Sequence, residues 1–126
     1  MKLFDVVPDK FFSILSSRNR VIYYDALMVL HDMFRFELNI REDDFVASLV
    51  SILEDKVFEV EEEDEVQESS LTVSGKARIL LNRLIRTGWI DQEFLDNTFI
   101  KILTPRTYAI PVLKMLSELG EEAQEM

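Results

Sequence analysis

The residues of this sequence best suited to binding a ligand are its basic residues. The segment 72–90 carries four basic residues and no acidic residue, and a helical wheel gathers them on one arc. Such an arc can contact DNA phosphates or guanine edges, with an isoleucine against a thymine methyl. It can equally dock a partner protein, since a lone apolar side chain ringed by arginines is common in interfaces, or it can be a solvated face. The candidate DNA or partner contacts, including one from the strand that follows, are Lys76, Arg78, Ile79, Arg83, Arg86 and Lys101.

Residues for catalysis or metal binding are scarce. The one histidine, His31, falls in the middle of an apolar segment, where we expect a packed or half-exposed core residue. Cysteine is absent, which excludes a disulfide, a thiolate metal site and a cysteine nucleophile. The phosphate-binding patterns GxxxxGK[ST] and GxGxxG are absent too. We therefore expect a non-enzymatic protein with no metal and no organic cofactor.

Acidic residues dominate the overall charge. The formal net charge is −10, and residues 59–70 contain seven acids and no base, which predicts a mobile acidic loop. This run lacks the EF-hand spacing and its central glycine, so a calcium site is disfavoured. Residues 71–106, in contrast, have six basic and three acidic residues. The net negative charge of the chain repels DNA, and only the segment 71–106 has the positive charge that would attract it.

The length and composition predict one domain. The chain has 126 residues, of which 48% are hydrophobic. Two acids and a proline interrupt the first ten residues, where a signal peptide would be apolar, and no stretch approaches the about 18 apolar residues of a membrane span. We expect a cytoplasmic chain, with association with the nucleoid left open.

Hydrophobic periodicity predicts four helices. The first covers 19–36, the second opens at Arg41 and ends near Lys56, and the third is the basic one. For the basic helix we predict Ser74 as the N-cap and Gly88 as the residue after the C-cap. The last helix is predicted from Pro105 to Leu119, with Pro111 kinking it or delaying its start and Gly120 ending it.

Alternation of apolar residues predicts a hairpin after the basic helix. The two strands cover 89–95 and 98–103, with Asp96-Asn97 as the turn. Ile90 and Phe94 would then face Ile100 and Ile102 across the hairpin, and residues 38–40 could supply a third strand. This order predicts an α+β winged helix, with a three-helix core, a short three-stranded wing sheet and a C-terminal helix. The acidic run separates the second and third helices, where a helix-turn-helix is normally tight.

Winged helices mostly bind duplex DNA or pair with protein partners. Pairing needs apolar surface left over from the core. The adjacent Phe11 and Phe12 cannot both enter one pocket, so one of them can anchor a partner chain, although we favour the alternative that both pack on the core of this domain. The candidates for a dimer interface are Leu3, Phe4, Phe11, Phe12, Tyr23 and Tyr24.

The segments 3–30, 74–90 and 108–119, together with the acidic run, resemble the N-terminal region of the JetA family. JetA proteins are kleisin-like subunits of bacterial Wadjet systems and are similar to the kleisins MukF and MksF. The resemblance covers nearly all of the chain and rests on packing residues. It implies that residues 1–126 are the N-terminal winged-helix domain of a longer protein, and that this domain forms a homodimer. It also implies that regions outside this chain engage an SMC-like ATPase, while a separate nuclease subunit cuts plasmid DNA.

Two functions remain from the sequence. The first is a non-catalytic assembly and dimerisation module of an SMC-type complex that acts on plasmid or chromosomal DNA, with no membrane contact. The alternative is a DNA-binding winged-helix transcriptional regulator that uses the basic arc as its reading surface.

Overall fold

The structure, a computed structural model, describes residues 2–59 and 72–125. Apart from Glu59, the predicted acidic loop lies outside the described residues. In chain order the elements are α1 (Leu3–Val6), the 3₁₀ helix η1 (Phe11–Ser16), α2 (Arg20–Phe36), β1 (Ile40–Arg41), α3 (Glu42–Leu53), α4 (Val73–Arg86), β2 (Ile90–Phe94), β3 (Lys101–Pro105) and α5 (Ala109–Glu125).

The core lies between α2, α3 and α4, which correspond to the first three of the four predicted helices. On α2 the buried residues recur at helical spacing, and Ala26, Leu27 and Leu30 have no exposed surface. Each fully buried leucine contributes about 1.5–3 kcal/mol relative to an exposed one. α2 packs against α3, α5, η1 and β3.

Both ends of α4 are defined by local hydrogen bonds. The N-cap is Thr72 and not Ser74, since the Thr72 hydroxyl accepts a hydrogen bond from the main-chain N–H of Gly75 at 3.0 Å. The C-terminal prediction is confirmed, because Gly88 has φ +91° and donates to the carbonyl of Ile85, while Trp89 donates to that of Leu84. This arrangement stops the helix and turns Trp89 into the core, where it is fully buried.

A three-stranded antiparallel sheet follows, in the order β1-β3-β2. A third strand is present as predicted, with Ile40 opposite Leu103, but it covers Ile40–Arg41 and not 38–40. The predicted hairpin register is wrong, since Ile90 lies opposite Pro105 and Phe94 opposite Lys101. The turn is where it was expected, with Thr98 donating to the carbonyl of Leu95. However, Leu95 pairs with Ile100, so the loop has four residues, which shifts every partner.

The C-terminal helix is longer than predicted. Pro111 lies in the first turn of α5, where a main-chain N–H has no acceptor within the helix. The proline therefore does not break the helix, which begins at Ala109, later than the predicted Pro105. Gly120 does not end the helix, which continues to Glu125. A Cβ at Gly120 would overlap the hydroxyl of Tyr24, so this glycine allows α5 to approach α2 closely.

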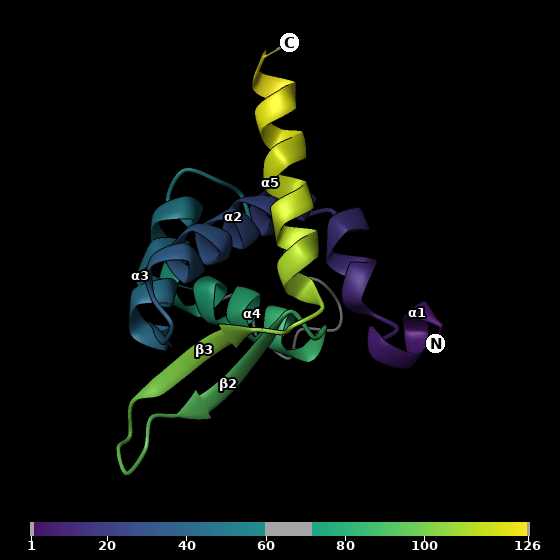
Figure 1. Ribbon diagram of the computed structural model, residues 1–126. Coiled ribbons are helices and arrows are strands. Elements are labelled where there is room, and N and C mark those ends of the chain that lie inside the picture. The colour runs from purple at the N-terminus through teal and green to yellow at the C-terminus, as the bar shows by residue number, and fades with distance from the viewer. Residues whose placement is uncertain (1, 60–71, 126) are drawn as a thin grey trace.

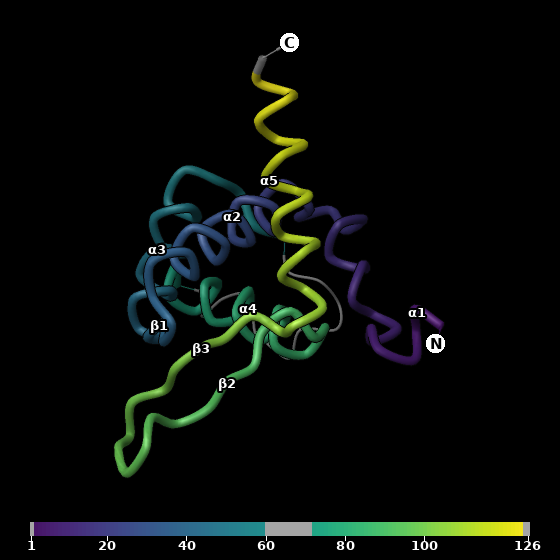
Figure 2. Tube along the Cα trace, viewed as in Figure 1, coloured from purple at the N-terminus to yellow at the C-terminus, as the bar shows by residue number. Residues whose placement is uncertain are grey.

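Figure 1 shows how these elements sit in space. The β2–β3 hairpin projects from the helical body, the end of α5 projects in another direction, and α1 lies on the side away from the hairpin (Figures 1 and 2). The predicted fold class is therefore confirmed, and the chain is α+β with a winged-helix-like arrangement.

Candidate partner-binding surfaces and the basic helix

Arg78, the first arginine of the predicted basic arc, is engaged inside the chain. Its Nη1 donates to Oε2 of Glu42 at 3.0 Å, and its Nη2 lies 3.9 Å from a carboxylate oxygen of Asp43. Glu42 is the first residue of α3 and is only 4% exposed. Gln92 of β2 donates to the other oxygen of Glu42, so one buried carboxylate joins α3, α4 and the wing.

Two further members of the arc are covered by the rest of the chain. Ile79 and Arg83 are each 8% exposed, because α4 packs against both α3 and β2. The prediction that both form a contact surface is corrected by this burial. Lys76 is half-buried and Arg86 is exposed. The structure thus breaks up the continuous basic arc of the helical wheel.

The wing carries little additional positive charge. Lys101 is exposed, and its Nζ lies 5.8 Å from the centre of the Phe94 ring. Arg106 at the base of the hairpin pairs with Asp91, at 3.0 Å from Nε to a carboxylate oxygen. Apart from Arg78, the exposed basic residues among the predicted contacts are Arg86 and Lys101, and they lie on separate elements.

The predicted dimer candidates divide into exposed and buried residues. Leu3 and Phe4 are each 58% exposed on α1, and Phe12 is 40% exposed. Phe11 and Tyr23 lie in the core at 0% and 1%, so their prediction as interface residues is wrong. The expectation that both adjacent phenylalanines pack on the core is met by Phe11 alone, since Phe12 keeps 40% of its surface exposed. Tyr24 is half-buried, and its hydroxyl donates to the Leu116 carbonyl of α5 at 3.3 Å.

A second apolar surface was missed by the sequence analysis. It lies on the side of the molecule from which the hairpin projects, and it comes from the end of α2 and from the hairpin tip. Phe99, at 97%, is the most exposed large hydrophobic residue of the described chain. Its place beside Asp96, Asn97 and Thr98 was the available signal, since a large aromatic residue in a turn has no core to enter. The residues of this surface are Phe36, Leu38, Phe94, Leu95 and Phe99.

His31 and the acidic residues are the side chains of the described chain that could bind a metal ion. His31 is half-buried on α2, as expected. Within residues 2–59 and 72–125, no three His, Asp or Glu side chains come together as a metal site would need. None of the helices described combines the length and the apolar character needed to cross a membrane.

Comparison with known proteins gives one family. Residues 29–126 match the family described as Wadjet protein JetA. The chain is similar to the Wadjet protein JetA of Bacillus cereus (strain Q1), with 28% identity over 124 residues. That alignment covers 95% of this chain and 27% of the relative, so the chain spans about a quarter of the relative's length. No solved structure matches it. Because the family match covers well over half of the residues, this chain belongs to the JetA family of Wadjet proteins.

Proposed function

We propose that this chain is a non-catalytic assembly module of a kleisin-like subunit in a cytoplasmic Wadjet complex. In this proposal residues 1–126 form one winged-helix domain, the N-terminal part of a longer protein, and the domain pairs with a second copy of itself. An SMC-like ATPase and accessory subunits bind through regions outside this chain, and plasmid or chromosomal DNA is reached through the whole complex. The family match supports the Wadjet assignment, and the short coverage of the relative supports the role of one module among several.

The ion pairs and the burial of the arginines on the basic helix α4 favour an assembly role over DNA recognition. A recognition helix presents its basic side chains outward to the major groove. On α4, Arg78 is held by Glu42 and Asp43, and Arg83 is buried. The same helix therefore serves mainly to hold α3 and the wing in place.

Exposed apolar surface supports the pairing of two copies. None of the four residues of α1 is buried, and Leu3 and Phe4 present more than half of their surface to solvent. Together with Phe12 they are the predicted interface residues that remain available. Clusters of exposed apolar residues commonly mark protein interaction sites.

Sedimentation velocity tests the proposal. The chain is run over a range of concentrations at near-physiological salt, alone and with a 20–30 base-pair duplex. We expect a reversible homodimer that sediments independently of the DNA. A monomer at every concentration would contradict the pairing.

Arginine variants separate the proposal from a transcriptional regulator. If the chain bound DNA through α4, Arg78→Ala and Arg86→Ala would weaken binding and reduce the salt dependence of the affinity. Lys114→Ala, an exposed charge on α5, is the matched control. DNA binding that is lost in the two arginine variants and kept in the control would favour the regulator.

A further inference from the structure

The outer part of α5 is not covered by the rest of the described chain. Among residues 109–124, the buried ones are Ala109 and Leu113, and α5 packs against α2. Residues 121–124 are all exposed, and Figures 1 and 2 show this end of the helix projecting from the body. The close approach of α5 to α2 at Gly120 is thus followed by a helical stretch that stands in solvent.

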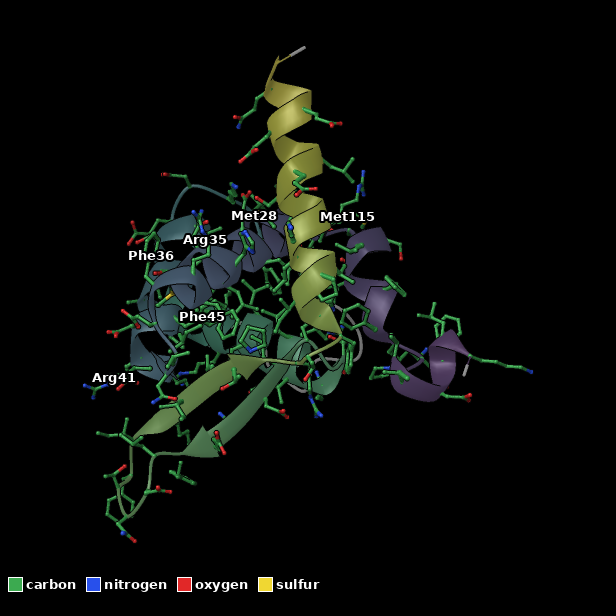
Figure 3. All side chains as sticks on the ribbon, viewed as in Figure 1. Met28, Arg35, Phe36, Arg41, Phe45 and Met115 are labelled. Atoms are coloured by element: carbon green, nitrogen blue, oxygen red, sulfur yellow. The ribbon has the colours of Figure 1, made fainter. Side chains whose placement is uncertain are left out.

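An apolar stripe on α5 is left uncovered as well. It consists of Met115 and Leu119, which are 50% and 53% exposed and lie one turn apart on the same side of the helix. This stripe runs beside Val112 and Leu116, which are half-buried against the core. Figure 3 labels Met115 on α5 at the level of α2. The apolar arc of α5 is therefore wider than the part that α2 covers, as in a helix that packs on two sides.

The charges at this end of α5 destabilise the helix. Glu118, Glu121 and Glu122 are exposed, and they form no ion pair with any residue in 2–59 or 72–125. Glu118 lies three and four positions before the other two, a spacing at which like charges on a helix repel. The helix dipole favours basic residues at this end, and the last turn of α5 has none. Because most helices in proteins depend on tertiary packing, this end of α5 lacks a partner that supplies positive charge and apolar contact.

We propose that a basic amphipathic helix, from the part of the protein outside residues 1–126, packs along the stripe of Met115 and Leu119. Its apolar side would cover the stripe. Its lysines or arginines would pair with Glu118 and Glu122, which the helical spacing places beside the stripe, on the side away from Leu116. This inference rests on the proposed function, in which residues 1–126 are one module of a longer protein. The aligned segment is 27% of the relative, so a protein of that length has ample chain to supply the helix.

Other occupants fit the outer part of α5 less well. The acidic run 59–70 contains no basic residue, so the glutamates of α5 would repel it. Duplex DNA would be repelled for the same reason. The α5 helix of a second copy carries the same glutamates, so two such helices side by side would place like charges together.

Amide hydrogen exchange in two lengths of the protein tests the proposal. Mass spectrometry of peptides that cover residues 117–125 is compared between the chain 1–126 and the full-length protein. We expect exchange to be about tenfold or more slower in the full-length protein, because a packed helix opens less often than one in solvent. Equal exchange in the two lengths would overturn the inference. It would leave the assembly role standing, since sedimentation tests that role separately.

Glutamates in the apolar stripe should remove this protection. Met115→Glu/Leu119→Glu would bury two carboxylates against the docked helix, so we expect exchange in the full-length protein to rise to the rate of the chain 1–126. In the chain 1–126 itself, where both positions face water, we expect little change. Val57→Glu, at an exposed apolar residue after α3, is the matched control and should alter neither protein. Protection that persists in the full-length double variant would overturn the proposal.

Reversing the charges should act with opposite sign in the two proteins. In the chain 1–126, Glu118→Lys/Glu122→Lys removes like-charge repulsion and suits the helix dipole, so we expect slower exchange of residues 117–125. In the full-length protein the same variant opposes the basic helix, so we expect faster exchange. A change in the same direction in both proteins would overturn the proposal. Protection of the full-length protein that appears only as its concentration rises would instead place a second copy on the stripe, and would also overturn it.

Discussion

The ring of Phe11 stacks on the indole of Trp89, with 3.8 Å between ring centroids and 18° between planes. The indole Nε1 also donates to the main-chain carbonyl of Phe11 at 2.7 Å. Both side chains have no exposed surface. Residues 78 positions apart are thus joined by a ring contact and a buried hydrogen bond, which ties η1 to the junction of α4 and the wing.

Replacing Phe11 should therefore cost far more than replacing its neighbour. Phe11→Ala removes a fully buried ring, and we expect the free energy of unfolding to fall by about 3–5 kcal/mol. Phe12→Ala removes a ring that is 40% exposed, and we expect a loss of about 1 kcal/mol or less. Urea denaturation of the two variants measures the difference. Equal losses would contradict the assignment of Phe11 to the core.

The buried carboxylate of Glu42 should stabilise the junction of α3, α4 and β2. Glu42→Ala removes the acceptor for Arg78 and Gln92, and we expect about 2 kcal/mol of lost stability, since hydrogen bonds to charged groups are worth about 1.5–3 kcal/mol. Asp44→Ala is the control in the same helical turn, where an exposed acid contributes under about 1 kcal/mol through the helix dipole. A Glu42→Ala variant as stable as this control would show that the carboxylate does not hold the junction.

Gly120 and Tyr24 should be energetically coupled. Alanine is a better helix former than glycine by about 1 kcal/mol, but its Cβ would meet the Tyr24 hydroxyl and displace that group from the Leu116 carbonyl. We expect Gly120→Ala to be neutral or destabilising in the wild type and stabilising by about 1 kcal/mol in a Tyr24→Phe background. Thermal denaturation of the four chains of this double-mutant cycle measures the coupling. Additive effects would contradict the close approach of α5 to α2.

Tyr108 should make stability depend on alkaline pH. Burial of the ring raises the pKa of Tyr108 above its ordinary value, and the phenol donates to the Gly88 carbonyl at 2.6 Å. The folded chain holds this proton more tightly than the unfolded chain. The contribution of Tyr108 to the free energy of unfolding is therefore complete below the unfolded pKa of about 10, and it is lost as pH rises through the higher folded pKa.

Tyr108→Phe tests this dependence. The variant should lose about 1 kcal/mol at neutral pH, since the hydrogen bond is gone, and should lack the Tyr108 contribution to the alkaline decline. Denaturation in urea at pH 8 and at several values above 10 gives both quantities. The other tyrosines remain in both proteins, so the comparison isolates Tyr108. An unchanged pH profile would contradict the role of this phenol.

Local patterns in the sequence determined most of the fold. Periodicity located α2, α3 and α4 because each helix buries one face at a spacing of 3.6 residues, and glycine at position 88 ended α4 because its backbone has positive φ. The alternation after it located the wing. The scarcity of chemically reactive residue types likewise gave no basis for predicting catalysis.

Only the tertiary structure decided what each surface residue does. A helical wheel places Ile79 and Arg83 outside, yet α4 is covered by both α3 and β2, and Arg78 meets a carboxylate 36 positions away. The hairpin register depended on a loop two residues longer than its turn signal suggests, and that loop is what brings Phe99 into the open. Gly120 resembles a helix end in sequence and is a point of contact in space. These outcomes depend on contacts between segments that are distant in the sequence. Such contacts produce no periodic pattern in the sequence of either segment.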